Sequence, residues 1–416
     1  MLRPHPVSIP RCLLAASLAT TLALAMILAG CGGDDGAPAP LSLALDVDST
    51  ATEVCASLEV TATVANGDPA MVAWYVNGVL GGNSTTGTVS QSNPATFTAP
   101  EAVPGEPTIT IRAVSQQDST KADSCRVTVE FTIIHVNAAL GSDAIGTGCI
   151  TRPFKTIRSA LDAASAGMTV LAAAGTYNAA GGEVYPFYIP AGVSLVGENW
   201  ETTVLQSNLP QMISIAETNC AVRKFTLAED PGLPSGWNMT ILVQSPAESA
   251  VLDSLRMSDV AVNANVRVHS TTGTTITDCR FVAEGDPSGG RGFEIIFDDA
   301  GTVVRDCVIS GFSTGIFLNG HANPLIEGCT IDGNIYGVSL CCYGSDTNNP
   351  VPDLGGGARG SLGGNIIRNN TYYGLRNPTK SVIYAKYNTW THDPPVFGSA
   401  YGSDIYNEGT GSVIVE

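Results

Sequence analysis

Two successive segments of the chain, Gly301–Gly320 and His321–Leu340, follow one pattern of apolar and polar positions. Cys307 and Cys329 occupy equivalent places 22 residues apart, and an aliphatic pair precedes each of them. Short β-branched runs alternate with Gly, Asn and Asp, and no period of 3.6 residues is present. A repeat of this length accommodates three short strands, which bury their apolar face only by stacking on neighbouring repeats. The pattern predicts the coils of a right-handed parallel β-helix.

The pattern continues on both sides of these two coils. Aligned on the position of Cys307, it recurs at Phe225, Ser254, Cys279, Cys329, Asn365 and Asn388. Each coil advances by one strand spacing, about 4.8 Å, so the six steps span roughly 30 Å. Coils longer than 22 residues predict loops that project from a constant core, and such loops are where function usually lies.

A short helical pattern precedes the coils. Ile157, Ala160, Leu161 and Ala164 form one apolar stripe, and Gly167 is the expected stop signal. The first coil of a solenoid exposes unpaired strand edges and an open core. We therefore expect this helix to cap the β-helix.

Residues 41–133 show a different pattern, an alternation with a period of two that is typical of a β-sandwich. Cys55 and Cys125 lie at opposite ends of this region, and we expect a disulfide between them; the alternative is two buried thiols. The expected strands are Ser57–Val64, Met71–Gly78, Pro94–Pro100, Thr108–Ser115 and Arg126–Ile133.

The first 30 residues read as a targeting segment. Arg3 and Arg11 precede a long apolar run that ends in Leu-Ala-Gly followed by Cys31. This ending resembles a bacterial lipobox, which implies acylation of Cys31, cleavage after Gly30 and sorting to the outer membrane. A transmembrane anchor is the alternative. Residues 31–40 are expected to form a flexible tether.

Composition narrows the function classes. The 416 residues include 38 acidic and 20 basic ones, a net charge of −18, which argues against nucleic acid as a partner. The eleven cysteines indicate an oxidising compartment. Without Cys12 and Cys31, nine remain, an odd number that leaves at least one unpaired within a monomer, the state we expect. The pairing of four of them stays open: Cys149, Cys220, Cys341 and Cys342.

Two resemblances to known families follow from local motifs. The motifs Gly141–Asp143, Pro153–Ile157, Gly175–Tyr177 and Gly192–Gly197 are similar to the opening of bacterial pectate-lyase-like β-helix domains, in particular a domain-of-unknown-function family. The stretch that begins at Val72 resembles bacterial immunoglobulin-like modules. Together they imply an all-β protein with an immunoglobulin-like spacer (41–133) and a parallel β-helix (134–416), preceded by the expected lipoprotein signal peptide (1–30) and tether (31–40).

The aligned cysteines are the first candidates for chemistry. Cys279, Cys307 and Cys329 are expected to stack as a ladder that Asn365 and Asn388 continue. We interpret the ladder as inward packing, because a zinc site would need CxxC spacing or clustered histidines. The sequence therefore predicts no metal there.

Enzymes of the pectate-lyase-like fold provide an alternative. The resemblance implies, for a lyase, carboxylates that hold Ca²⁺ and a Lys or Arg that takes a proton. Arg256, Arg280 and Arg305 occupy different offsets in the aligned coils, so no basic row is expected.

Acidic and aromatic residues give two weaker hypotheses. Asp298 and Asp299, with His321, are the catalytic candidates for a glycosidase or lyase, although adjacent acidic residues are ordinary in a surface turn. Aromatic residues near the end of the chain would either stack on sugars or pack at its edge: Tyr372, Tyr373, Tyr384, Tyr387 and Trp390.

The sequence thus predicts a lipid-anchored outer-membrane protein whose β-helix serves a non-catalytic structural or polysaccharide-binding role, without a cofactor. The alternative is a polysaccharide lyase or glycoside hydrolase that acts on acidic polysaccharide, with Ca²⁺ as a candidate ion.

Overall fold

The computed structural model describes residues 39–207, 209, 211–229, 239–258, 264–283, 290–297, 301–341 and 349–416. Cys31, Asp298, Asp299 and Cys342 lie outside these residues. Within the described part of the chain, no helix has the length and apolar character needed to cross a membrane.

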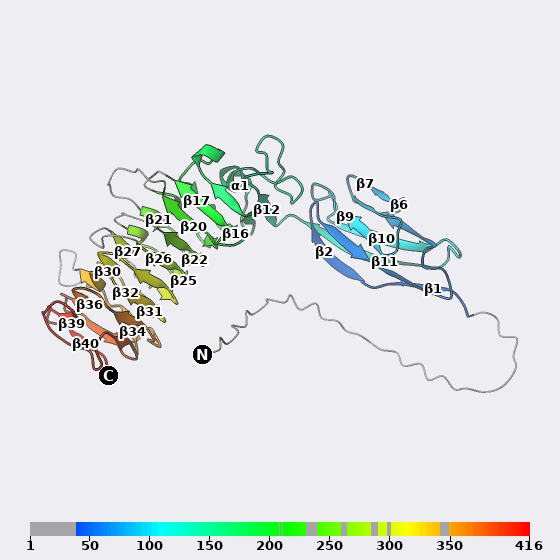
Figure 1. Ribbon diagram of the computed structural model, residues 1–416. Coiled ribbons are helices and arrows are strands. Elements are labelled where there is room, and N and C mark those ends of the chain that lie inside the picture. Colours follow the sequence, from blue (N-terminus) through cyan, green and yellow to red (C-terminus); the bar gives the residue numbers. More distant parts are fainter. Residues whose placement is uncertain are drawn as a thin grey trace, which may run out of the picture. The chain divides into compact units, whose positions relative to one another are not determined.

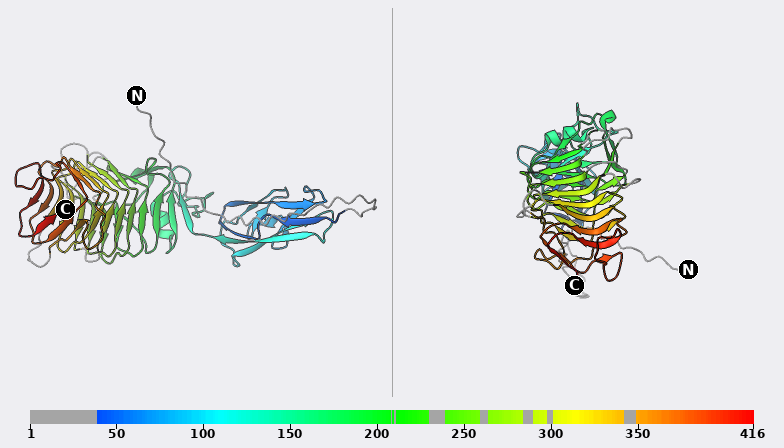
Figure 2. Two further views of the ribbon diagram at one scale, coloured as in Figure 1. Left: turned by 90° about the horizontal axis from the view of Figure 1, so that it is seen from below. Right: turned by 90° about the vertical axis from the view of Figure 1, so that its left-hand side faces the viewer.

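Three long parallel β-sheets form the larger part of the structure, and successive coils add one strand to each sheet in turn (Figures 1 and 2). The first sheet contains β12 (Ile133–Val136), β13 (Thr169–Ala172), β16 (Ser194–Gly197), β19 (Ala221–Arg223), β22 (Val251–Asp253), β25 (Thr275–Thr277), β28 (Val303–Arg305), β31 (Leu325–Glu327), β34 (Asp353–Gly355), β37 (Val382–Ala385) and β40 (Ser412–Ile414). The second sheet contains β14 (Gly175–Tyr177), β17 (Thr203–Ser207), β20 (Thr226–Glu229), β23 (Arg256–Ser258), β26 (Arg280–Val282), β29 (Val308–Ser310), β32 (Thr330–Asp332), β35 (Ile366–Arg368) and β38 (Thr389–Trp390). The third sheet contains β15 (Phe187–Tyr188), β18 (Ile213–Ile215), β21 (Met239–Gln244), β24 (Ala264–His269), β27 (Arg291–Ile296), β30 (Thr314–Asn319), β33 (Tyr336–Cys341), β36 (Tyr373–Asn377) and β39 (Ser403–Asn407). This arrangement confirms the predicted all-β class and the parallel β-helix.

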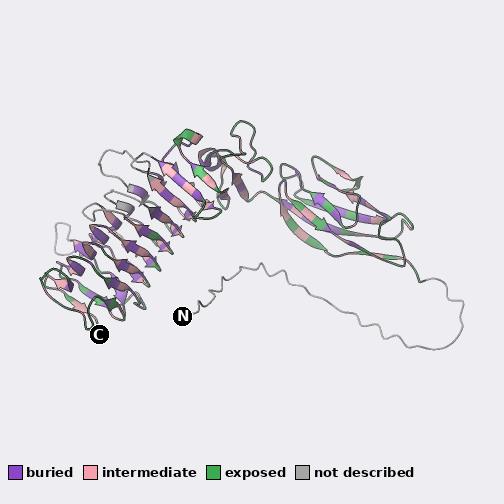
Figure 3. Ribbon diagram, viewed as in Figure 1, coloured by how far each residue is buried: buried purple, intermediate pink, exposed green. Residues whose placement is uncertain are grey.

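The core of the β-helix lies between the three sheets, where the buried strand residues are concentrated (Figure 3). In the first sheet, Ile276, Val304 and Ile326 are in register on adjacent strands, and all three are fully buried. Burying an aliphatic side chain of this size stabilises the fold by about 1.5–3 kcal/mol. Stacked aliphatic residues in successive coils therefore supply the main stabilising free energy of the solenoid.

In the coils from β19 to β32, a one-residue turn joins the first sheet to the second sheet, whereas the connection between β34 and β35 is longer. The turn residue has a positive φ, for example 55° at Ser254 and 54° at Asp306, and the next residue points into the core. The residue equivalent to Phe225 is therefore Leu255, because β20 and β23 pair Thr226 with Arg256. The predicted alignment on Ser254 was wrong by one residue.

Helix α1 (Ile157–Ala163) covers the first coil, as its contacts with β12, β13 and β15 indicate. Its buried residues include Ala160 and Leu161 from the predicted stripe. Thr156 caps its N-terminus by accepting a hydrogen bond from the Ser159 backbone N–H. The helix ends earlier than the predicted stop at Gly167, because Ala164 already has extended backbone geometry. A short 3₁₀ helix, η1 (Ala179–Gly181), follows β14.

The N-terminal part of the described chain forms a β-sandwich. One sheet has the order β2 (Ser49–Glu53), β11 (Ala122–Glu130), β10 (Thr108–Ser115), β5 (Val72–Val76) and β6 (Val79–Leu80). The other has the order β3 (Ser57–Val60), β9 (Ala95–Thr98), β8 (Gly87–Val89) and β7 (Gly82–Asn83), and β1 (Ser42–Leu45) pairs with β4 (Ala62–Ala65). Trp74 on β5 is fully buried in the core of the sandwich.

The predicted disulfide between Cys55 and Cys125 is wrong: Cys55 is bonded to Cys149, and Cys125 is a buried free thiol. The sheet register explains the difference. Strands β2 and β11 run parallel with Ser49 beside Arg126, so Cys55 lies about seven residues, roughly 23 Å, along the sheet from Cys125. A disulfide requires Cα atoms within about 7 Å of each other.

Candidate functional site

The outer surface of the third sheet carries a row of large polar and aromatic side chains, which we call the outer face. These residues point away from the core because their neighbours in the strands, such as Phe293 and Ile295, are fully buried. Parallel register stacks one residue from each strand into the row: Arg267, Glu294, Phe317, Ser339, Arg376 and Tyr406. Five strand spacings make this row about 24 Å long.

At one end of the outer face, a carboxylate holds two arginines. Glu294 is only 3% exposed; it accepts a hydrogen bond of 2.6 Å from Arg267 Nε and forms an ion pair with Arg291. The Arg291 guanidinium carbon lies 3.6 Å from the centroid of the Phe317 ring. Charge-assisted hydrogen bonds and a cation–π contact fix these side chains in place. A charge as buried as that of Glu294 is tolerated because it is paired.

At the other end, five tyrosines form a connected group, which we call the tyrosine cluster: Tyr336, Tyr372, Tyr373, Tyr401 and Tyr406. The rings of Tyr372 and Tyr401 are stacked, with centroids 4.1 Å apart and planes 4° apart. Tyr373 and Tyr406 lie 4.6 Å apart, and Tyr336 meets Tyr372 edge-on at 5.3 Å. Contacts of this kind stabilise ring pairs by about 0.5–1.5 kcal/mol beyond burial.

The tyrosine cluster is partly open to solvent and partly anchored. Tyr401 is 70% exposed, whereas Tyr373 is 6% exposed and donates a hydrogen bond of 2.9 Å to the Ser399 carbonyl. Partial burial raises the pKa of Tyr336 above its ordinary value, because burial disfavours the charged phenolate. Arg376 lies between Ser339 and Tyr406 in register and pairs with Glu408 at 2.7 Å. Aromatic faces with hydrogen-bonding groups at their edges suit a ring-shaped polar ligand.

The predicted aromatic group is only partly correct. Tyr372 and Tyr373 belong to the tyrosine cluster, but Trp390 is buried in the core and Tyr384 lies on the first sheet. Sequence reasoning missed Tyr336, Tyr401 and Tyr406. Aligning the third-sheet strands would have found two of them, because Tyr336 is the register partner of Tyr373 and Tyr406 is the register partner of Arg376.

The predicted catalytic group is only partly within the described residues. Asp298 and Asp299 lie outside them. His321 follows β30, and its ring centroid is 5.3 Å from that of Phe297. The catalytic hypothesis for these residues therefore stays a prediction.

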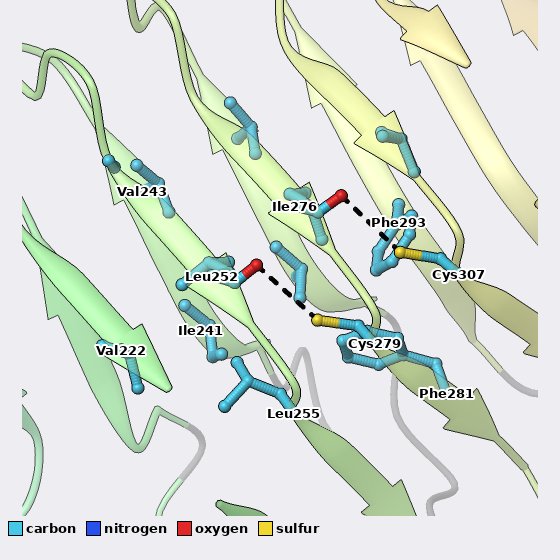
Figure 4. Close-up of a cluster of buried hydrophobic side chains, with 14 of the residues drawn as sticks. Val222, Ile241, Val243, Leu252, Leu255, Ile276, Cys279, Phe281, Phe293 and Cys307 are labelled. Carbon is cyan, nitrogen blue, oxygen red and sulfur yellow. Dashed lines mark hydrogen bonds between the residues drawn. The ribbon is translucent and has the colours of Figure 1, made fainter. Parts of the chain in front are cut away.

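The ladder residues lie on one line inside the β-helix. The thiols of Cys279 and Cys307 donate to the backbone carbonyls of Leu252 and Ile276, at 3.8 Å and 3.6 Å (Figure 4). Hydrogen bonding to Cys279, together with burial, raises the pKa of Cys307 well above its ordinary value. The Cys307 thiol therefore stays protonated, which makes it unsuited to a nucleophilic or metal-binding role.

Asparagine continues the ladder by hydrogen bonding. Asn365 Oδ1 accepts from the Cys329 backbone N–H at 2.9 Å, and Asn388 Oδ1 accepts from the Asn365 backbone N–H at 2.9 Å. Among the described residues, no group of three or more His, Cys, Asp or Glu side chains is arranged to hold a metal ion. The suggested Ca²⁺ thus stays a prediction of the enzymatic alternative.

One prediction about the basic residues was wrong. Arg256 and Arg280 are register partners on β23 and β26, so these two form a short basic pair on the second sheet. The Arg256 guanidinium lies 3.0 Å above the Trp200 ring, and burial lowers its pKa. The one-residue error at Ser254 had moved Arg256 out of line. Arg305 lies on the first sheet, where it pairs with Glu327 at 3.0 Å.

Three parallel sheets with a strand of each in successive coils define a parallel β-helix protein, a class known for polar outer faces on a stacked apolar core. The chain belongs to the family described as "Protein of unknown function (DUF1565)", which it matches over residues 139–397. No curated protein matches the chain.

The chain is also similar to solved structures. A rhamnogalacturonan lyase is similar with a TM-score of 0.51 and 15% identity, over 65% of this chain and 74% of that chain. Pectin methylesterase PemA from Erwinia chrysanthemi is similar with a TM-score of 0.41 and 10% identity, over 66% of this chain and 93% of that chain. At such identities, the likeness to the lyase shows the fold alone.

Proposed function

We propose that this protein is a non-catalytic, lipid-anchored glycan-binding protein of the cell envelope. The tyrosine cluster on the outer face carries the proposal. Its exposed Tyr401 ring, stacked on Tyr372, offers a flat apolar surface, and Arg376 and Glu408 place hydrogen-bonding groups beside it. A sugar ring presents an apolar face and a rim of hydroxyls, which is the complement of this surface.

The length of the outer face supports binding to a chain of sugars. Adjacent strands repeat every 4.8 Å or so, and successive sugar units of an extended chain recur on a similar scale. Arg267, Arg291 and Phe317 continue the polar and aromatic surface beyond the tyrosine cluster. Their positions are held by Glu294, so little side-chain entropy would be lost on binding.

The remaining parts of the proposal come from the sequence. Acylation of Cys31 would anchor the chain, and the tether at residues 31–40 would separate the folded part from the bilayer. The sandwich, which we propose to be an immunoglobulin-like spacer, would hold the β-helix away from the membrane.

Affinity electrophoresis of the full-length protein in gels that contain neutral or uronic-acid polysaccharides tests this function. We expect retardation by at least one polysaccharide, and Tyr401→Ala combined with Tyr372→Ala should weaken it at least tenfold. Tyr384→Ala is the matched control, because Tyr384 lies on the first sheet and should leave binding unchanged. If the double variant and Tyr384→Ala bind the polysaccharide equally well, the tyrosine cluster has no role in binding.

The same polysaccharides, incubated with the protein and Ca²⁺, distinguish binding from catalysis. A non-catalytic protein yields neither unsaturated ends, seen as absorbance of the new double bond, nor new reducing ends. Turnover that disappears in Asp298→Ala or Asp299→Ala would replace the proposal by the lyase or glycosidase alternative.

A further inference from the structure

A pocket separate from the tyrosine cluster lies at the last coil, next to β38 and the segment that connects it to β39. It is a pocket of about 410 Å³, and its lining includes Trp390, Tyr387, Phe397 and His392. Tyr387 is 72% exposed and Phe397 is 51% exposed, so both rings are available to a ligand. Aromatic walls with a few fixed polar groups are typical of small-molecule sites.

A buried carboxylate holds the one histidine of this pocket. Asp404 Oδ2 lies 2.8 Å from His392 Nδ1, and the Asp404 side chain is 1% exposed, while that of His392 is 48% exposed. Asp404 also accepts hydrogen bonds from the backbone N–H groups of Thr391 and Val396, each at 2.9 Å. Since a carboxylate held by N–H donors is an acceptor, Nδ1 is the protonated nitrogen of His392.

This hydrogen bond determines what His392 presents to the pocket. With the proton on Nδ1, the neutral imidazole carries a lone pair on Nε2 and acts there as a hydrogen-bond acceptor. The orientation is built in, because both oxygens of Asp404 are occupied by groups of the same connecting segment. The pocket therefore combines aromatic rings with a fixed acceptor.

The charges of the pocket restrict the ligand. Asp393 and Glu416 are also part of its lining, so the local charge is negative. Like charges at short distance disfavour an anionic ligand. We infer that the pocket binds a neutral saccharide ring, stacked on the aromatic wall and donating a hydroxyl hydrogen bond to His392 Nε2. This inference rests on the proposed glycan-binding function and names the sugar class of a site separate from the tyrosine cluster.

Histidine-specific NMR tests the inference directly. The full-length protein contains five histidines, so selective ¹⁵N-histidine labelling gives few signals, and His392→Asn assigns the signal of interest. Two-bond ¹H–¹⁵N correlations should show the Nδ1–H form of His392. Methyl glucoside, methyl galactoside and N-acetylglucosamine are then titrated as neutral probes, and galacturonate is titrated as the anionic probe.

Two histidine variants separate positioning from recognition. His392→Asn can keep the donor to Asp404 but lacks the group at Nε2, so we expect at least a tenfold loss of affinity for the neutral sugar. His392→Gln places an amide near the Nε2 position and should bind more tightly than His392→Asn. Tyr401→Ala should leave this pocket unaffected.

The outcomes are distinct for the two proposals. A saturable shift of His392 with a neutral sugar, lost in His392→Asn, supports the inference. The inference is contradicted if galacturonate binds as strongly as the neutral sugars. It is also contradicted if the His392 signal is unchanged with all four probes. If His392 is unchanged while polysaccharides still bind through the tyrosine cluster, only the pocket inference fails. If polysaccharide binding is also absent, the proposed function fails with it.

Discussion

Cys55 and Cys149 form a disulfide that spans 94 residues and has its Cα atoms 5.9 Å apart. Cys55 follows β2 of the sandwich, and Cys149 lies in the loop that precedes helix α1 of the β-helix. The Cys149 side chain packs with the buried core of the sandwich. This bond therefore ties the sandwich covalently to the segment that leads into the first coil.

Removing this disulfide should destabilise the protein. The chain-entropy model gives about 4–5 kcal/mol for a loop of this length, and native disulfides usually contribute about 2–4 kcal/mol. We expect Cys149→Ser to lower the free energy of unfolding by about 2–4 kcal/mol in denaturant titrations. Cys125→Ala should keep the disulfide, as mass spectrometry of non-reduced peptides will show. A peptide that links Cys55 to Cys125 would contradict the structure.

Glu183 should make the stability depend on pH. Burial raises its pKa from 4.5 to about 7, although Ile157 and Arg158 donate backbone hydrogen bonds to it. Between these two values, the folded protein keeps a proton that the unfolded chain releases, so stability falls as the pH rises through this window. This pKa shift corresponds to about 3 kcal/mol of stability at low pH, and all of that stability is lost above about pH 7.

The variant Glu183→Gln removes the titrating group and leaves the others unchanged. Relative to the natural chain, we expect the variant to become more stable as the pH rises. The relative gain should reach up to about 3 kcal/mol between pH 4 and pH 8. Denaturant titrations at several pH values measure it. Parallel stability curves for the two proteins would show that Glu183 is not responsible.

Replacing Asn365 should lower the free energy of unfolding more than replacing most other ladder residues. It is fully buried, and its side-chain amide donates to the carbonyls of Ile326 and Leu354 at 3.1 Å and 3.0 Å. Replacing it by alanine leaves the Cys329 N–H without its acceptor, which costs about 1–3 kcal/mol, whereas the two carbonyls keep hydrogen bonds from Ser361 and Asn388. With the lost packing included, we expect a loss of about 2–3 kcal/mol in thermal or chemical unfolding.

Cys307→Ala is the matched control for Asn365→Ala. Both substitutions truncate a buried ladder residue, but Cys307 offers only weak thiol hydrogen bonds. Its removal should cost about 1 kcal/mol, mainly through lost packing. Equal losses for the two variants would indicate that hydrogen bonding by Asn365 adds little.

Anchoring through Cys31 is tested by fractionation. We expect Cys31→Ser to abolish incorporation of labelled palmitate and to shift the protein from the membrane fraction to the soluble fraction, because acyl chains supply the membrane affinity. Cys12→Ser is the control, since Cys12 precedes the predicted cleavage point and should leave both readouts unchanged. The lipoprotein proposal is contradicted if Cys31→Ser stays in the membrane fraction although it carries no labelled palmitate.

The fold was largely predictable because its determinants are local and repeated. Ile309 and Ile331 recur at the coil period and are fully buried, and parallel register then stacks equivalent positions. Short turns keep that register. The alignment failed at Ser254 because positive φ at a non-glycine residue gives no clear sequence signal, and a shift of one residue reverses which side chains point inward.

The candidate sites were less predictable because their residues come from different coils. The rings of Tyr372 and Tyr373 join Tyr336 to Tyr401, and connecting segments of unequal length separate these residues along the chain. The pairing of His392 with Asp404 depends on how one such segment folds back onto β39, which the backbone hydrogen bonds of Ile405 with Val396 and Gly398 determine. Aligning the coils in sequence therefore does not predict the path of this connecting segment.

By itself, the sequence determined the period of the coils, the inward rows of the core, the capping helix and the two-part β architecture, because side-chain alternation and repeat length are local properties. Only the tertiary structure decided the partner of Cys55, the members of the tyrosine cluster and the orientation of His392. These depend on distances between segments remote in the chain, which sheet register and the paths of the loops set.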